Sequence, residues 1–278
     1  MLCLFLRAGR PRLLLVPLFC LLLPLVFAPG PFAQAAEKDG KAQKAPVFTL
    51  LPLYSLPHNP GHSTQGLFFH LDKLYESTGG YGTSVIACKD PQSGETLRER
   101  ALPPDYFGEG AVVAQGTLYL LTWKNRVCLM LHPDTLAEKD RFGYPGEGWG
   151  LAYDGSSLIR SDGSSFLYFH DLGGTVLGKL QVRDGADAVE GLNELEWIPG
   201  QGLLLANIWR TSDIVAIDLK SGSVRFRLNL EGLVPAEFAA AHVANGIALS
   251  PDGSELWITG KCWPRIFVAA WPIEGAPQ

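Results

Sequence analysis

Hydrophobic residues along this chain gather in short runs, and one arrangement of runs occurs five times. Each copy opens with a polar or indole side chain, continues with a few apolar residues and a turn, and then enters a second apolar run. The copies open at Gln65-Gly66-Leu67, Glu109-Gly110-Ala111, Trp149-Gly150-Leu151, Asn193-Glu194-Leu195 and Asn245-Gly246-Ile247. Their second residues are 44, 40, 44 and 52 positions apart. Repeats of about 40 to 50 residues with several strands each are typical of β-propeller blades.

Further strand-like runs complete most of these units. A third run follows each pair, and turn-forming sequences such as Lys220-Ser221-Gly222 then lead into a fourth run such as Val224–Leu230. The fifth unit ends without a fourth run, whereas an unassigned strand, Val47–Tyr54, precedes the first unit. If this strand completes the last unit, the ring closes and no strand edge stays exposed. We therefore predict an all-β fold, a five-bladed β-propeller closed by an N-terminal strand. Only Val234–Ala244 looks briefly helical.

The N-terminal segment has the pattern of an export signal. Basic residues at Arg7, Arg10 and Arg12 precede the apolar run Leu13–Phe27, and Ala33-Gln34-Ala35 fits a cleavage site. The apolar run is shorter than the roughly 20 residues that a membrane span requires. We predict a signal peptide at 1–35, a flexible lead-in at 36–45 and one propeller domain at 46–273. The protein is then expected in the periplasm or outside the cell, free of the membrane after cleavage.

Charge and cysteine content narrow the functional classes. The net charge is −5 and no basic stripe is present, so a nucleic-acid partner is not expected. We expect a monomer. The cysteines beyond the signal are Cys88, Cys128 and Cys262, an odd number whose pairing the spacing leaves open. Cys88 and Cys128 lie in strand-like runs and are interpreted as buried thiols. No CxxC motif or histidine cluster suggests zinc.

The repeat also predicts where a functional site would lie. In a hairpin, the start of the first strand is beside the end of the second, and first strands line the channel of a propeller. Residues at these positions should therefore meet at one channel mouth; they are Gln65, Glu109, Trp149, Asn193, Asn245, Glu76-Ser77, Trp123, Ser161-Asp162, Trp209 and Lys261. Each alone could be a packing or turn residue. Because different residue types occupy one register, a polar pocket with apolar walls is the better interpretation.

The ordered motifs of the chain resemble those of a known family. They include His58-Asn59-Pro60, Thr64-Gln65-Gly66-Leu67, Tyr75-Glu76-Ser77-Thr78-Gly79, Phe107-Gly108-Glu109-Gly110, Gly148-Trp149-Gly150-Leu151, Leu192-Asn193-Glu194-Leu195, Ala206-Asn207-Ile208-Trp209 and Gly260-Lys261-Cys262-Trp263-Pro264. Together, from about residue 47 to 271, the chain resembles the plant- and bacterial-type glutaminyl cyclases. This resemblance implies a five-bladed propeller that converts the N-terminal glutamine of a peptide or protein to pyroglutamate and releases ammonia. It implies no required cofactor or metal, although a structural cation in the channel is compatible with it.

The resemblance also implies roles for individual residues. Glu109 would carry a proton from the α-amine to the leaving ammonia, Asn193 would donate a hydrogen bond to the γ-carbonyl oxygen, and Lys261 would steady the substrate or share in charge stabilisation. Substrate-binding residues would be Gln65, Phe107, Trp123, Trp149 and Trp209. Glu76 is expected to support the rim. The family usually has Phe where this chain has Ser63, which puts the fit of the substrate's second residue in question.

Two other functions compete with this interpretation. Asn245-Gly246-Ile247-Ala248 resembles a phrase of calcium-dependent lactonase propellers, in which oxygen atoms such as those of Glu109, Asn193 and Asn245 hold a cation. Such propellers have six blades, however, and Lys261 at the same mouth would repel a cation. The second alternative, a propeller that binds peptides without catalysis, does not account for Glu109, Asn193 and Lys261 together.

Overall fold

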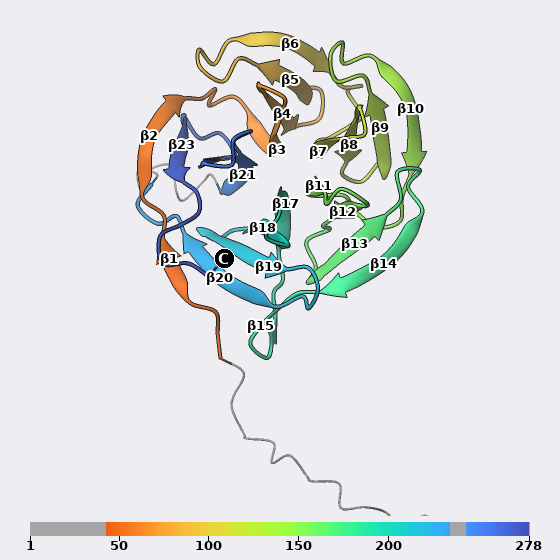
Figure 1. The fold of residues 1–278 in the computed structure, drawn as a ribbon. Helices are drawn as coiled ribbons and strands as arrows, with labels where there is room; N and C mark the ends of the chain where they lie inside the picture. Colours follow the sequence, from red (N-terminus) through yellow and green to blue (C-terminus); the bar gives the residue numbers. More distant parts are fainter. Residues whose placement is uncertain (1–42, 234–242, 278) are drawn as a thin grey trace, which may run out of the picture. The chain divides into compact units, whose positions relative to one another are not determined.

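The computed structural model describes residues 43–233 and 243–277, which lie within one compact unit, residues 40–278. The described residues form strands and turns and contain no helix, and hence none that could span a membrane. Five sheets surround a common centre, and the first strand of each sheet lies nearest to it (Figure 1). The predicted all-β, five-bladed propeller is therefore confirmed, and the six blades of the lactonase alternative are not present.

The first three blades are four-stranded antiparallel sheets. The first contains β3 (Ser63–His70), β4 (Lys73–Gly79), β5 (Val85–Lys89) and β6 (Thr96–Ala101). The second contains β7 (Gly108–Ala114), β8 (Thr117–Thr122), β9 (Val127–Leu131) and β10 (Glu138–Gly143). The third contains β11 (Leu151–Tyr153), β12 (Leu158–Arg160), β13 (Phe166–His170) and β14 (Val176–Gln181), and a short hairpin of β15 (Arg183–Asp184) and β16 (Asp187–Ala188) follows it.

The last two blades take in strands from the beginning of the chain. The fourth contains β17 (Leu192–Ile198), β18 (Leu203–Ile208), β19 (Asp213–Asp218) and β20 (Val224–Asn229). The fifth contains β21 (Ala244–Leu249), β22 (Glu255–Gly260) and β23 (Arg265–Ala270). The helix predicted at 234–244 lies outside the described residues except at its end, where Ala244 begins β21.

Ring closure differs in one respect from the prediction. The predicted single strand at 47–54 is two strands, β1 (Val47–Thr49) and β2 (Pro52–Pro57). β2 pairs with β23 and completes the fifth blade, as expected, but β1 pairs in parallel with β20 and adds a fifth strand to the fourth blade. Between them, Leu50 is only 1% exposed and packs with core residues of both blades. Burial of Leu50 in this inter-blade core accounts for the break between the two strands.

The residues before β1 have contacts of their own. Ala45 donates a backbone hydrogen bond to Asp184 Oδ1 at 2.7 Å, and Lys44 lies 2.6 Å from Asp187. Both acidic residues belong to the β15–β16 hairpin. The end of the predicted lead-in is thus attached to the propeller.

The glycines of the repeated openings allow the inner strands of neighbouring blades to touch. A Cβ atom on Gly110 would lie 2.4 Å from the backbone nitrogen of Leu151, and one on Gly150 would lie 2.0 Å from the carbonyl oxygen of Asn193. No side chain fits at such distances. Where the fourth copy has Glu194 instead, its carboxylate crosses to accept hydrogen bonds from the backbone nitrogens of Leu67 (3.2 Å) and Ile247 (2.9 Å).

This contact gives a stability prediction. We expect Gly150→Ala to lower the free energy of unfolding by about 2 kcal/mol or more, because its methyl group would push the third and fourth blades apart. Gly178→Ala is the matched control, since a Cβ atom there meets nothing within 4 Å. Denaturant unfolding of both variants checks the prediction, and equal stability of the two would contradict it.

Candidate active site

A pocket of about 210 Å³ gathers residues from the inner ends of all five blades. Starts of first strands and ends of second strands supply most of its lining, as the repeat predicted. The lining residues are Gln65, Phe107, Glu109, Trp123, Trp149, Asn193, Trp209 and Lys261. The structure therefore brings together all eight residues that the sequence singled out as catalytic or substrate-binding.

A β-bulge places several of these side chains. The pairing of β7 with β8 shifts its register between Gly108 and Ala111, and the pairing of β17 with β18 shifts between Leu192 and Leu195. The first-strand register also shifts around Gln65. A bulge leaves a residue out of the ladder and re-aims its side chain. The same irregularity thus turns Glu109, Asn193 and Gln65 toward the pocket.

Serine hydroxyls lock the backbone of two site residues. Ser77 Oγ donates to the carbonyl oxygen of Glu109 at 2.6 Å, from the blade before it. Ser161 Oγ donates in the same way to the carbonyl oxygen of Asn193 at 2.7 Å. Ser77 lies near the end of β4 and Ser161 directly follows β12, and both were expected at the pocket mouth. They do not line the pocket, but they fix the backbone of the residues that do.

Aromatic side chains form the walls. Phe107 packs against Trp123 with ring centroids 5.5 Å apart, and Trp149 packs against Trp209 at 5.4 Å. Trp209 remains 39% exposed, so this wall borders the opening of the pocket. An apolar wall of this kind limits the water that can reach a bound substrate.

Glu147 holds two of these indoles and was missed from the sequence. Its Oε2 accepts hydrogen bonds from Trp123 Nε1 at 2.7 Å and from Trp149 Nε1 at 3.0 Å. One carboxylate oxygen thus fixes Trp123, which lies between β8 and β9 of the second blade, and Trp149, which precedes β11 of the third. The only sequence signal was its place two residues before Trp149, which does not reveal the contact with Trp123.

Glu109 and Lys261 interact electrostatically within the pocket; Glu109 is buried and Lys261 is partly exposed. Burial raises the pKa of the Glu109 carboxyl well above its usual value; Lys261 works against this rise, and the negative charge of Glu147 adds to it. Burial lowers the pKa of the Lys261 ammonium, and Glu109 opposes that shift. A carboxyl group with a raised pKa is suited to accept a proton and return it within one reaction.

The amide of Asn193 has hydrogen-bonding capacity left over. Asn193 is 2% exposed, and within the described part of the chain its Oδ1 has no hydrogen-bond partner. A buried amide oxygen without a partner costs free energy that a bound ligand can recover. Gln65, by contrast, is already oriented, because its Oε1 accepts from Asn245 Nδ2 at 3.3 Å.

Some residues expected at the mouth lie elsewhere. Asn245 does not line the pocket, so it does not join Glu109 and Asn193 there in the arrangement that the lactonase alternative needs. Asp162 accepts hydrogen bonds from Ser164 within a turn. Neither Glu76 of β4 nor Ser63, which begins β3, lines the pocket.

None of the three cysteines in the described residues forms a disulfide. Cys88 and Cys128 are buried free thiols, as predicted, and Cys262 is partly exposed beside Lys261. Burial raises the pKa of the Cys128 thiol, which makes it unreactive.

Comparison with known proteins agrees with the fold and the pocket. The family model described as glutamine cyclotransferase matches residues 25–270. A glutaminyl-peptide cyclotransferase of Arabidopsis thaliana is 31% identical over 276 residues, which cover 94% of this chain and 86% of that protein. The crystal structure of Myxococcus xanthus glutaminyl cyclase superposes with a TM-score of 0.74 and 32% identity, covering 82% of this chain and 99% of the other.

Fold, pocket and relatives together define a β-propeller enzyme of the cyclase class. More particularly, the chain belongs to the glutamine cyclotransferase family.

Proposed function

We propose that this chain is a glutaminyl-peptide cyclotransferase and that the pocket around Glu109 is its active site. The substrate is a peptide or protein with an N-terminal glutamine, which becomes pyroglutamate as ammonia leaves. One observation carries the assignment of the site: a single cavity is lined by all eight residues that the family resemblance implies, and within it the buried Glu109 interacts electrostatically with Lys261.

The reaction requires the enzyme to hold the substrate side chain in a reactive conformation and to transfer a proton. The α-amine nitrogen attacks the γ-amide carbon of the same residue, so the nucleophile is already intramolecular. The new C–N bond closes the five-membered ring, and the bond to the amide nitrogen breaks. Glu109 accepts the proton that the attacking amine loses and delivers it to the departing nitrogen, which leaves as ammonia.

Asn193 and Lys261 stabilise the charge that develops. As the amine adds, the γ-carbonyl oxygen becomes an oxyanion, and the Asn193 amide donates a hydrogen bond to it. Lys261 supplies positive charge in the same small cavity. Because the indoles and Phe107 exclude water, both interactions are stronger than they would be in solvent. Gln65 binds near the α-amine.

The pocket electrostatics give a pH prediction. Glu109 must be ionised to accept the proton, and its raised pKa moves the acidic limb of kcat/KM well above the ordinary glutamate value of 4.5. Glu147→Gln removes a negative charge that raises this pKa, so we expect the limb to move to lower pH. The Gln side chain still offers an oxygen to the indoles. A pH–rate profile of both proteins checks this, and an unmoved or upward-moving limb would contradict it.

The direct test of the function is ammonia release from a short peptide that begins with Gln. Mass spectrometry should show the loss of one ammonia from the peptide, and a peptide beginning with Asn serves as the control. An aliquot treated with EDTA tests the expectation that turnover needs no metal. Absence of conversion at high enzyme concentration would exclude the proposed activity.

We further propose that residues 1–35 direct export and that the cleaved protein acts in the periplasm or outside the cell as a monomer. Support comes from the n-region, apolar run and cleavage motif of the N-terminus and from the acidic composition of the chain. No nucleic-acid or membrane partner is proposed. N-terminal sequencing of the exported protein and light scattering test these points.

A further inference from the structure

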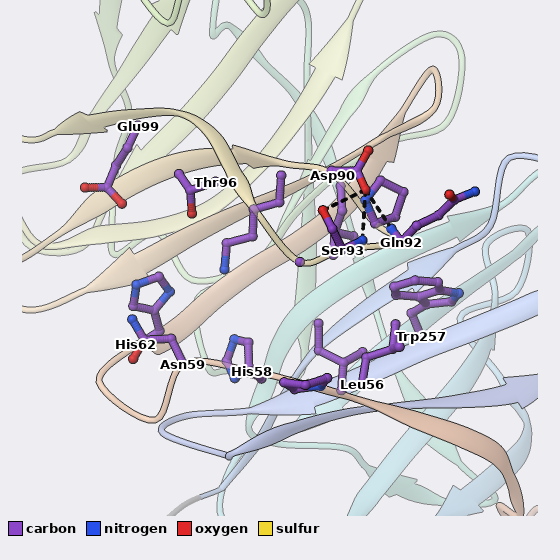
Figure 2. A pocket seen from close by; sticks show the side chains of 16 residues that line it. Leu56, His58, Asn59, His62, Asp90, Gln92, Ser93, Thr96, Glu99 and Trp257 are labelled. Atoms are coloured by element: carbon purple, nitrogen blue, oxygen red, sulfur yellow. Dashed lines mark hydrogen bonds between the residues drawn. The ribbon is translucent and has the colours of Figure 1, made fainter.

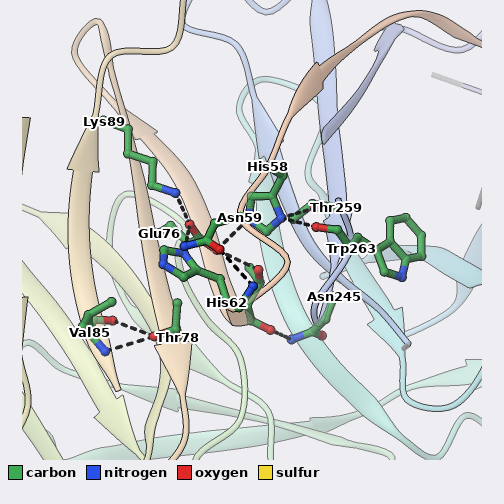
Figure 3. A network of polar contacts seen from close by, with 12 residues as sticks. His58, Asn59, His62, Glu76, Thr78, Val85, Lys89, Asn245, Thr259 and Trp263 are labelled. Atoms are coloured by element: carbon green, nitrogen blue, oxygen red, sulfur yellow. Dashed lines mark hydrogen bonds and ion pairs between the residues drawn. The ribbon is translucent and has the colours of Figure 1, made fainter. Parts of the chain in front are cut away.

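A buried charge cluster gathers around Glu76, and the proposed mechanism does not use it (Figure 3). At its centre, the Glu76 side chain of β4 is 1% exposed. Its Oε1 accepts from His58 Nε2 at 2.9 Å and from Thr64 Oγ1 at 2.7 Å. Its Oε2 accepts from His62 Nδ1 at 2.9 Å and from the ammonium of Lys89. Four donors therefore converge on one carboxylate.

The cluster is ionic. The two ring nitrogens of His58 face two acceptors, the carbonyl oxygen of Trp263 at 2.6 Å and the carboxylate of Glu76 at 2.9 Å. Burial alone would raise the pKa of Glu76, but hydrogen bonds from His58 and His62 and the charge of Lys89 hold it well below its usual value. Glu76 is thus held in its charged form beside the ammonium of Lys89.

Most of these donors lie on one connecting segment. Residues 58–62 link β2 of the fifth blade to β3 of the first, and Ser63 and Thr64 at the start of β3 complete a segment, 58–64, that leads directly into Gln65 of the pocket. Glu76 binds this segment through His58, His62 and Thr64. The position of Gln65 therefore depends on how the segment is held.

The same segment is also hydrogen-bonded to the loop that carries Lys261. The backbone nitrogen of His58 donates to the carbonyl oxygen of Pro264 at 2.9 Å, and that of Cys262 donates to the carbonyl oxygen of His62 at 2.7 Å. From the other side, Asn245 Nδ2 donates to the carbonyl oxygen of Thr64 at 2.9 Å. The cluster, the segment and the loop after β22 form one connected network.

We propose that Glu76 is a positioning residue for the cyclisation. Its charge cluster fixes residues 58–65 against the loop 261–264 and so sets Gln65 and Lys261 in the pocket. This inference rests on the proposed function, and Glu76 acts on the substrate only through those two residues. It extends the expectation that Glu76 merely supports the rim.

A metal site is the competing interpretation of the same residues. The donor atoms of His58, His62 and Glu76 lie within 4.8 Å of one another. The sequence suggested no histidine cluster, and the β3–β4 hairpin is what brings Glu76 to this segment. A cavity of about 300 Å³ lined by His58, His62 and Lys89 adjoins them (Figure 2). However, Lys89 already neutralises Glu76, and its ammonium would repel a divalent ion. The geometry therefore favours the ion cluster.

A double-mutant cycle tests the proposal in the full chain. Glu76→Gln keeps the shape of the side chain, but its amide NH₂ faces donor groups where the carboxylate had an accepting oxygen. We expect kcat/KM to fall by about 10²-fold, because a displacement of about 1 Å in a site residue can lower the rate by this factor. Gln65→Ala should lower it as well. Because Glu76 acts partly through Gln65, the loss in the double variant should be at least tenfold smaller than the product of the single losses.

Controls separate positioning from general stability. Asp184→Asn alters another buried carboxylate, which pairs with Arg227 at 2.8 Å. Asp184 belongs to the β15–β16 hairpin, away from the centre of the propeller (Figure 1). This variant should lower the melting temperature and leave kcat/KM unchanged. If Glu76→Gln does not fold, His62→Ala, at a partly exposed side chain, replaces it in the cycle.

The outcomes are distinct. Wild-type conversion of the Gln peptide establishes the proposed function, and Glu76→Gln activity within twofold of wild type would then overturn the positioning role alone. Fully multiplicative losses in the cycle would overturn it too. Stoichiometric metal in the purified wild-type protein, absent from His62→Ala, would replace it with the metal site.

Discussion

Replacing Glu109 by Gln should reduce kcat by about 10³-fold while the fold stays intact, because general acid–base catalysis contributes on the order of 10²–10⁴. The amide has the same shape but cannot take the proton from the α-amine. The folded state disfavours the ionised carboxyl, since burial raises its pKa. Stability from this group is therefore present below pH 4.5 and is lost as pH rises through the raised pKa. An uncharged Gln avoids that loss, so no fall in melting temperature is expected.

The matched control is Glu196→Gln. Glu196 is a partly buried carboxyl on a first strand. Desolvation raises its pKa to about 8, and it accepts a hydrogen bond from the Leu249 nitrogen at 2.8 Å. It does not line the pocket, so the same chemical change there should leave kcat within twofold. Steady-state kinetics on a Gln peptide, with thermal unfolding, checks both variants. Residual activity of Glu109→Gln within tenfold of wild type would exclude Glu109 as the proton carrier.

Replacing Asn193 by Ala should lower kcat by about 10²–10³-fold, the usual effect of removing one oxyanion donor. Its hydrogen bond strengthens as charge develops on the γ-carbonyl oxygen, so the loss should fall on kcat more than on KM. The backbone should stay in place, because Ser161 binds the carbonyl oxygen of residue 193 and not its side chain.

Asn245→Ala provides the comparison at the equivalent opening of the next blade. Asn245 contacts Gln65 and the backbone of Thr64 but does not line the pocket, so its effect should be at least tenfold smaller. Measurement of kcat and KM for both variants decides the point. Equal losses, or a loss at Asn193 confined to KM, would contradict the oxyanion role.

The sequence by itself determined the blade number and the composition of the pocket. Successive openings such as Glu109 and Asn193 occupy one register, and a closed ring of equivalent hairpins must bring equivalent positions to one end of the channel. The periodicity of the sequence predicts which positions are equivalent, because each unit repeats the same strand and turn pattern.

Only the tertiary structure decided the contacts between distant segments. It divided 47–54 into two strands because Leu50 is buried between blades, and it joined Glu147 to the indole of Trp123. It also gathered His58 and Lys89 around Glu76. Such hydrogen bonds and ion pairs depend on the three-dimensional approach of side chains from separate strands and loops, which no run of neighbouring residues encodes.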